Sequence, residues 1–250
     1  MGTYTKKSLF LAGMIVLLYN CTHGSADADT IFINDTLQVA ASLVFADDFD
    51  SGFENWVPEH EKEMILPSII KGALVINAPD GSTTWFKEKL TAPVMIEYEA
   101  VVIGKGGPND RVSDLNCFWL ATDPGYPNDF FKKSKERKGI FENYDHMQLY
   151  YVGLGGHNNT KTRFRRYDGT GEKPLLPEHD LSDEKYLITP NAVNRIRIVV
   201  YHGIVQFYRN EQLIFDFFDP HPYSEGYFGI RTVRNHMTVN NFKVYSLSEK

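Results

Sequence analysis

The sequence predicts an all-β fold, a β-sandwich or jelly roll built from short strands. Alternating or continuous apolar runs of strand length recur along the chain, and segments rich in Gly, Pro and Asn separate them. No stretch has the apolar period of a long amphipathic helix, and no internal repeat is visible. The expected strands are 43–45, 73–76, 94–102, 116–121, 146–152, 162–167, 195–201, 205–209, 212–217, 227–232 and 241–245.

Length and composition are those of one globular domain. The chain has 250 residues, of which 42% are apolar, 23% charged and 14% aromatic. An all-β domain often reaches this size undivided, so residues 43–250 are expected to form a single sandwich with catalytic function. The formal charge of −6 gives no reason to expect a nucleic-acid partner.

The first 28 residues are interpreted as an export signal and a short linker. Two lysines precede an apolar run, 9–18, which is too short to span a bilayer as a stable helix. Processing is expected either before Cys21, which would carry a lipid, or after the A-x-A sequence at 26–28. We therefore expect an exported protein, in the periplasm or as an outer-membrane lipoprotein, with membrane contact only through Cys21.

No cofactor is expected, and no metal in the catalytic site. The acidic turn at Asp47, Asp48 and Asp50 could bind a structural calcium ion, although a simple capped turn explains it equally well. Cys117 stands between apolar residues and is interpreted as a buried, inert thiol.

Polar side chains are concentrated between Asp145 and Tyr167, which is interpreted as two strands around a Gly/Asn-rich turn containing His157. Alternation places His146, Gln148 and Tyr150 on one face of the first strand, opposite the apolar Met147 and Leu149. On the second strand Arg163 and Arg165 share a face. If these two polar rows meet on one side of the sheet, they form a site for an acidic sugar.

Two insertions flank this stretch, Asp123–Tyr144 and Gly169–Asp183. Loops of this length in a compact domain are usually functional or disordered, so both are expected to wall a cleft. The alternative is surface decoration.

This set of residue types suits β-elimination at a uronic acid. The reaction needs groups that neutralise the carboxylate, a base for the C5 proton and an acid for the oxygen leaving C4. Arginine and amide side chains can do the first, and His and Tyr the other two.

Family resemblances extend this hypothesis. The sequence H-M-Q-L-Y at 146–150 is similar to the Q-x-H strand of jelly-roll alginate lyases with its order reversed, and R-V-S-D-L-N at 111–116 is similar to their R-S/T-E-L-R strand. D-D-F-D-S-G at 47–52 and the last strand resemble the ends of secreted concanavalin A-like sandwiches. Together with N-D-R-V-S-D-L-N-C-F-W, Y-Y-V-G-L-G-G-H-N-N-T-K-T-R-F-R-R-Y and F-G-I-R-T-V-R-N-H-M, the chain resembles an exported Bacteroidetes family of this superfamily, one that includes the ulvan oligosaccharide dehydratase. The resemblance implies a carbon–oxygen lyase that forms a 4,5-unsaturated uronate on an acidic oligosaccharide or polysaccharide.

The expected catalytic residues are His146 as base and Tyr150 as acid, or the reverse. The expected substrate-binding residues are Gln148, Arg163, Arg165, Asn116, Arg111, Trp119 and Arg231. Asp110 and Arg111 are also interpreted as braces, and Arg234 and His236 as a second cluster. Each has a structural alternative: a paired sheet residue, a solvated arginine, or, for Trp119, the core.

Three other activities remain open. A chain-cleaving polysaccharide lyase would use the same chemistry with a different leaving group. A glycoside hydrolase would need two carboxylates, for which Asp110, Asp114 and Asp145 are available. A non-catalytic carbohydrate-binding module would need no base.

Overall fold

A computed structural model describes residues 1–2, 28–62 and 67–250. The apolar run 9–18 and Cys21 lie outside the described residues, so the export signal stays a prediction. No helix within those residues is long and apolar enough to cross a membrane. The prediction of an all-β sandwich is confirmed.

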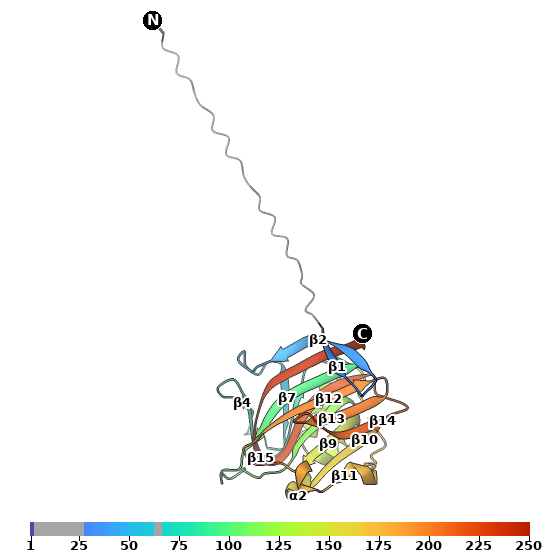
Figure 1. Cartoon of the computed structure of the whole chain (residues 1–250). Helices are drawn as coiled ribbons and strands as arrows, with labels where there is room; N and C mark the ends of the chain where they lie inside the picture. The colour runs from blue at the N-terminus through green and yellow to red at the C-terminus, as the bar shows by residue number, and fades with distance from the viewer. Residues whose placement is uncertain (3–27, 63–66) are drawn as a thin grey trace.

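The strands form two packed layers joined by one long strand, β15 (Glu225–Glu249), whose two ends belong to different layers (Figure 1). One of its neighbours changes from β8, paired as far as Arg231, to β7, paired from Met237, and its register with β5 shifts in between, at Val233 and Asn235. Sheet I contains β11 (Asp180–Leu181), β10 (Lys161–Asp168), β9 (Gln148–Gly155), β8 (Leu115–Thr122), the first half of β15, β5 (Leu74–Phe86) and β3 (Trp56–His60). Short strands β4 (Ser68–Ile69) and β6 (Leu90–Thr91) pair with β5 and β15.

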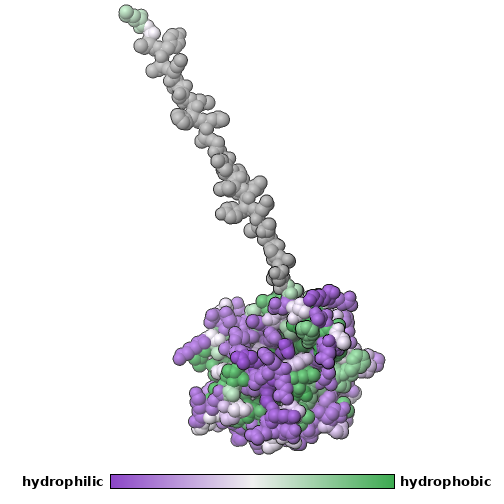
Figure 2. All heavy atoms as spheres, in the orientation of Figure 1, coloured by the Kyte–Doolittle hydropathy of each residue, from purple (hydrophilic) through white to green (hydrophobic). Residues whose placement is uncertain are grey.

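Sheet II contains β14 (Gln212–Phe218), β13 (Ile204–Arg209), β12 (Val193–Tyr201), β7 (Val94–Val102), the second half of β15, β2 (Gln38–Asp47) and β1 (Asp29–Phe32). Strand β1 therefore lies upstream of residue 43, where the sequence predicts the domain to begin. The β1–β2 hairpin packs Ile33 and Val39 onto the outer face of sheet II. The side of the molecule seen in Figure 2 is mostly polar, with small apolar patches.

The main core lies between the sheets. Alternate residues of β8, β9 and β10 face it, including Trp119, Tyr150 and Phe164, and they meet Phe207 and Phe215 of sheet II. Cys117 is buried there as expected, and burial raises the pKa of its thiol to about 12.

A second apolar cluster covers part of the outer face of sheet I. There Trp85, Phe118, Leu149 and Tyr167 lie beneath the first insertion, residues 123–144. The insertion contains η1 (Phe130–Lys133), α1 (Ser134–Arg137) and η2 (Phe141–Tyr144). The remaining single turns are α2 (Gly156–Asn159), η3 (Pro177–His179) and η4 (Glu184–Tyr186).

A buried ion pair fastens this insertion to sheet I. Arg137 donates from Nε and Nη2 to the Glu59 carboxylate at 3.0 Å and 2.6 Å, and the Tyr144 hydroxyl donates to the same carboxylate at 2.7 Å. Arg137 and Glu59 are 3% and 2% exposed, so water does not screen the pair. The insertion is thereby fixed above β3 and β5.

Candidate functional site

One polar row crosses the outer face of sheet I. Directly paired residues of neighbouring strands point the same way, so the row can be followed from strand to strand. It contains, in order from β10 to β3, Arg163, Gly153, Asn116, Arg231, Thr83 and Glu59. The adjacent row, two residues along, contains Arg165, Tyr151, Phe118, Gly229, Trp85 and Val57.

A pocket of about 350 Å³ opens where the first insertion leaves these rows uncovered. Its volume is in the range of small-ligand sites. Phe141 and Glu142 of the insertion form one wall. The other lining residues are Asp114, Asn116, Tyr151, Gly153, Gly156, His157, Lys161, Arg163, Arg165, Arg231 and Val233. We refer to it as the cationic pocket, because its arginines and lysine outnumber its carboxylates.

The floor of the pocket depends on Gly153. A Cβ atom at this residue would lie 2.5 Å from the Tyr151 hydroxyl oxygen, far closer than any normal contact. The missing side chain therefore lets the Tyr151 phenol lie along β9. Burial raises the pKa of Tyr151, against the opposing effect of the nearby Arg231 and Arg165 charges, so the phenol is protonated at neutral pH.

Two buried polar atoms at the pocket floor lack partners among the described residues. They are Asn116 Oδ1 and Arg231 Nε, and the two residues are directly paired across β8 and β15. Their side chains are almost fully buried, at 1% and 3% exposure. A buried donor and acceptor without partners are costly, so this pair is suited to a polar ligand or an ordered water.

The other arginines of the pocket are held by the second insertion. Arg163 donates from Nε to Asp180 Oδ1 at 2.9 Å and from Nη1 to His157 Nε2 at 2.6 Å. Hydrogen bonding from Arg163 lowers the pKa of the Asp180 carboxyl group. Arg165 donates to the carbonyl oxygen of Lys173.

His157 reaches the pocket from a left-handed turn. It and Asn158 have φ values of 53° and 57°. Asn residues tolerate this conformation, which explains the Asn pair at 158–159. Arg111 braces the turn, because it donates from Nε to Asn158 at 2.9 Å and from Nη1 to Asp114 at 2.7 Å. Since a guanidinium can only donate, His157 Nε2 is the acceptor in its contact with Arg163.

Comparison with known protein families identifies the chain. A family profile described as a domain of unknown function, DUF6250, matches residues 76–242. The chain belongs to this family. Comparison with curated proteins finds no significant match.

Solved structures share the fold of this DUF6250 chain at low sequence identity. A Bacillus subtilis protein of unknown function with a galectin-like fold superposes with a TM-score of 0.64 and 14% identity, covering 83% of this chain and 97% of its own. An endo-β-1,3-glucanase from Pyrococcus furiosus gives 0.54 and 14%, covering 88% and 99%. A carbohydrate-binding module, CBM66, from Bacillus subtilis gives 0.51 and 11%, covering 78% and 96%. These similarities establish a galectin-like or concanavalin A-like jelly roll, and they establish the fold alone.

The predicted meeting of His146, Gln148 and Tyr150 with the arginines is wrong. The Tyr150 side chain points into the core, where its hydroxyl donates to Asp219 at 2.7 Å. His146 is exposed in the turn before β9, and Gln148 donates to the carbonyl oxygen of Asp168. Gln148 pairs with Asp168 while Tyr151 pairs with Arg165, a shift of three residues or roughly 10 Å along the strand.

The other predicted binding residues of this DUF6250 chain fall into two groups, those that line the cationic pocket and those that do not. Asn116, Arg163, Arg165 and Arg231 line the cationic pocket. Trp119 packs in the core, so it cannot stack on a sugar, and Arg111 supports the pocket from outside its lining. The substrate-binding roles of Asn116, Arg163, Arg165 and Arg231 stay predictions.

The second predicted cluster, Arg234 and His236, does not line the cationic pocket. His236 and Asp110 are 2.8 Å apart, and the hydrogen bond from His236 lowers the pKa of Asp110. Arg234 lies at the register shift of β15 with φ 40°. The acidic turn behaves as a capped turn, because Asp47 accepts from Phe49 and Trp56 at 2.8 Å and 3.0 Å. Within the described residues no group of acidic, His or Cys side chains is arranged for a metal.

Sequence reasoning missed Tyr151, Gly153, His157, Lys161 and Phe141 as pocket residues. A usable signal was present in β9. Tyr150, Val152 and Leu154 alternate as large side chains, as a core-facing row does, while Gly153 interrupts the other row.

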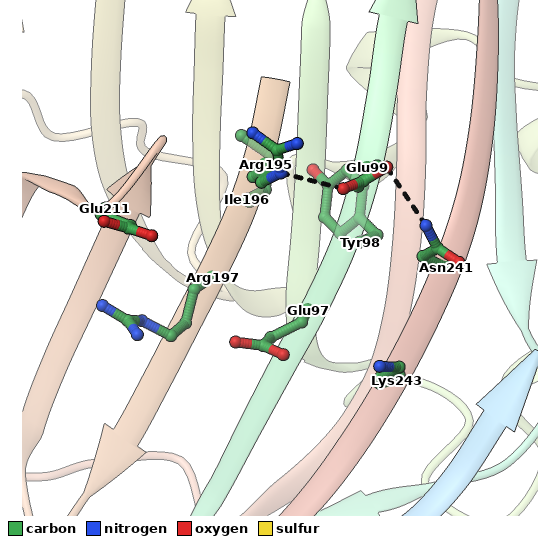
Figure 3. A pocket seen from close by; sticks show the side chains of 9 residues that line it. All are labelled: Glu97, Tyr98, Glu99, Arg195, Ile196, Arg197, Glu211, Asn241 and Lys243. Atoms are coloured by element: carbon green, nitrogen blue, oxygen red, sulfur yellow. Dashed lines mark hydrogen bonds and ion pairs between the residues drawn. The ribbon is translucent and has the colours of Figure 1, made fainter. Parts of the chain in front are cut away.

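A second hollow lies on the outer face of sheet II and has a different character (Figure 3). It measures about 310 Å³ and contains acidic and basic residues of three neighbouring strands. Glu99 accepts from Arg195 at 3.0 Å and from Asn241 at 3.1 Å, as Figure 3 shows. Its acidic and basic side chains compensate one another, so we do not consider it a candidate site. Its residues serve instead for control substitutions.

Proposed function

We propose that this protein acts by β-elimination on uronic-acid oligosaccharides of the ulvan type, as a dehydratase that forms a 4,5-unsaturated uronate at the non-reducing end. The observation that carries the proposal is that two buried atoms on the floor of a cationic pocket, Asn116 Oδ1 and Arg231 Nε, have no hydrogen-bond partner among the described residues. A sugar carboxylate matches the Arg231 donor and the nearby Arg165 charge. A sugar hydroxyl matches the Asn116 acceptor.

The cations would activate the substrate. Charge-assisted hydrogen bonds from Arg231 and Arg165 would stabilise the negative charge that builds on the carboxylate when the C5 proton leaves. Both arginines come from the rigid strands β15 and β10, so little reorganisation is needed during the reaction.

Tyr151 and His157 fit the proton transfers. His157 Nε2 would take the C5 proton once the substrate displaces Arg163 from it, and the C5 electron pair would form the C4–C5 double bond. The C4–O bond would break at the same time. The protonated Tyr151 would give its proton to the departing oxygen, which leaves as water, and solvent would return the proton from His157 to Tyr151.

The first insertion favours water over a sugar chain as the leaving group. Beyond the pocket, Trp85, Phe118 and Tyr144 form a packed aromatic cluster on the outer face of sheet I. A chain extending past C4 in that direction would meet this cluster. A terminal uronate, by contrast, needs no room there.

The test is incubation with ulvan-type oligosaccharides while ultraviolet absorbance and product mass are followed. A conjugated product lighter by one water supports dehydration. Two fragments, one of them unsaturated, mean a chain-cleaving lyase, and binding without reaction means a carbohydrate-binding module. Tyr151→Phe should lower turnover by about 10²-fold or more, whereas Arg195→Met on sheet II should leave it unchanged.

A glycoside hydrolase is the second candidate. Asp114 and Glu142 both line the pocket, and glycoside hydrolysis generally uses two carboxylates. One fold relative is a glucanase. Saturated fragments, together with inactivity of Asp114→Asn and Glu142→Gln, would favour this alternative.

A further inference from the structure

Phe141 lies against both the guanidinium and the phenol of the cationic pocket. The Arg231 Cζ atom is 4.3 Å from the centre of the Phe141 ring, and the Tyr151 ring is 5.4 Å away. On sheet I the ring stacks over Phe118 at 6.4 Å with an interplanar angle of 12°. The Lys173 ammonium lies 5.2 Å from the same ring. One insertion residue therefore contacts the charged and the aromatic parts of the pocket.

Arg231 has few other restraints. Its Nη2 donates to the carbonyl oxygen of Gly139 at 3.3 Å, a long hydrogen bond, and its Nε has no partner among the described residues. Gly139 belongs to the same insertion as Phe141. A buried guanidinium normally has an acidic partner. Within the part of the chain that the structure describes, Arg231 forms no ion pair, so the face of the Phe141 ring is a principal restraint on its orientation.

The insertion itself is firmly attached. The Arg137–Glu59 ion pair and the Tyr144 hydrogen bond tie it to β3, on either side of Gly139 in sequence. Phe141 is thus held by its own stacking and by a buried anchor.

We propose that Phe141 is a positioning residue for Arg231: its ring holds the guanidinium in the orientation that receives the substrate carboxylate. The insertion thereby sets affinity for an anionic sugar through Arg231, in addition to forming a wall. This inference rests on the proposed function for its ligand.

The test is a double-mutant cycle of Phe141→Leu and Arg231→Gln. Binding and turnover are measured with a tetrasaccharide that carries glucuronate at its non-reducing end. Phe141→Leu alone should raise KM about 2- to 30-fold, the range expected from losing a cation–π contact. In the Arg231→Gln background it should have little further effect. Phe141→Trp, which restores an aromatic face, should recover most of the affinity.

Phe131→Leu is the matched control. Phe131 lies in the same insertion and packs edge-on to Phe130 and Tyr227, away from Arg231. It should leave KM unchanged. An equal KM increase in Phe131→Leu, or additive effects of Phe141→Leu and Arg231→Gln, would overturn the inference, because either would mean a general loss of packing.

The wild type, Phe141→Leu, Arg231→Gln and the double variant are also compared by urea unfolding without ligand. Coupling that changes the unfolding equilibrium constant by a factor of about 2 to 30 beyond additivity supports the contact whether or not the uronate binds. If the wild-type protein does not bind the tetrasaccharide, the proposed function fails. Additive unfolding effects would overturn the positioning of Arg231 itself.

Discussion

Replacing Arg137 by methionine should leave the Glu59 carboxylate buried without its main partner. In the native protein this carboxylate receives hydrogen bonds from Arg137 and from Tyr144, and only the phenol would remain. Methionine keeps much of the length and volume of the arginine side chain. The perturbation therefore removes a charge more than it removes packing.

The size of the effect follows from burial. Breaking a buried ion pair by removing one partner costs about 3 to 5 kcal/mol, because the remaining charge is uncompensated. At about 2 to 4 °C per kcal/mol for a domain of this size, the melting temperature should fall by about 6 to 20 °C. Glu59→Gln should lose a smaller amount, since Asp123 Oδ2 remains 3.7 Å from Arg137 Nη1 and the glutamine carbonyl oxygen can still accept a hydrogen bond.

The double variant Glu59→Gln/Arg137→Met distinguishes charge from packing. It contains no buried charge, and glutamine still offers a carbonyl oxygen to Tyr144. We expect it to regain about half or more of the single-variant loss, since buried ion pairs can be replaced by neutral groups at little cost. The measurement is the free energy of unfolding in urea, monitored by tryptophan fluorescence.

Arg195→Met provides the control. Arg195 also pairs with a glutamate, Glu99, but its side chain is 65% exposed. Exposed pairs contribute about 0 to 1 kcal/mol, so this variant should unfold almost like the wild type. Arg137→Met and Arg195→Met with equal stability would refute the buried-anchor reasoning, as would a double variant less stable than either single one.

Three further predictions concern tyrosines and the pocket floor. Tyr150→Phe should cost about 1 to 3 kcal/mol of stability, since Asp219 loses a buried donor, while Tyr151→Phe should affect turnover instead; equal turnover losses would contradict their opposite orientations. Gly153→Ala should lower turnover about as much as Tyr151→Phe while the fold persists, and normal turnover in the alanine variant would disprove the role of the floor. Burial raises the pKa of several phenols, so the free energy of unfolding should fall above about pH 10, where only the unfolded chain ionises them; a flat stability curve up to pH 11 would contradict this. These phenols belong to Tyr98, Tyr144, Tyr150, Tyr151 and Tyr167.

The fold was predictable because most strands show alternating apolar and polar residues and are bounded by residues typical of turns. Segments such as 94–102 and 195–201 match β7 and β12 closely, since in 96–102 and 193–198 buried residues alternate with more exposed ones. In β7 the acidic Glu97 and Glu99 alternate with buried neighbours. Such strands show their inner face directly.

The phase of β9 was not predictable in the same way. Leu149 is buried, as expected for a core residue, but it is buried beneath the first insertion rather than between the sheets. Tyr150 carries a hydroxyl and was interpreted as facing outward, yet Asp219 satisfies that hydroxyl inside the protein. When both faces of a strand are covered, alternation no longer identifies the core face.

The outward orientation of Arg163 and Arg165 was predictable, because only one face of β10 at these residues is apolar. Phe164 marks the core side, so Arg163 and Arg165 must face outward together. Their juxtaposition with Asn116 and Arg231 required the register of three strand pairs, which composition does not encode. A one-residue shift in any of those pairs would have turned a whole strand over.

The first insertion explains both the error and the pocket. Because it covers Leu149 and Phe118, the outer face of sheet I carries apolar residues there, as a core-facing strand does. Where its cover ends at Phe141, Tyr151, Asn116 and Arg231 line one pocket and are themselves almost fully buried. Arginine and phenol side chains on an uncovered sheet would be hydrated, and their charges and hydrogen bonds would be weakened by water. The covered strand face that misleads sequence analysis is therefore also the condition for strong electrostatic recognition, and loosening the Arg137 anchor should weaken uronate binding together with stability.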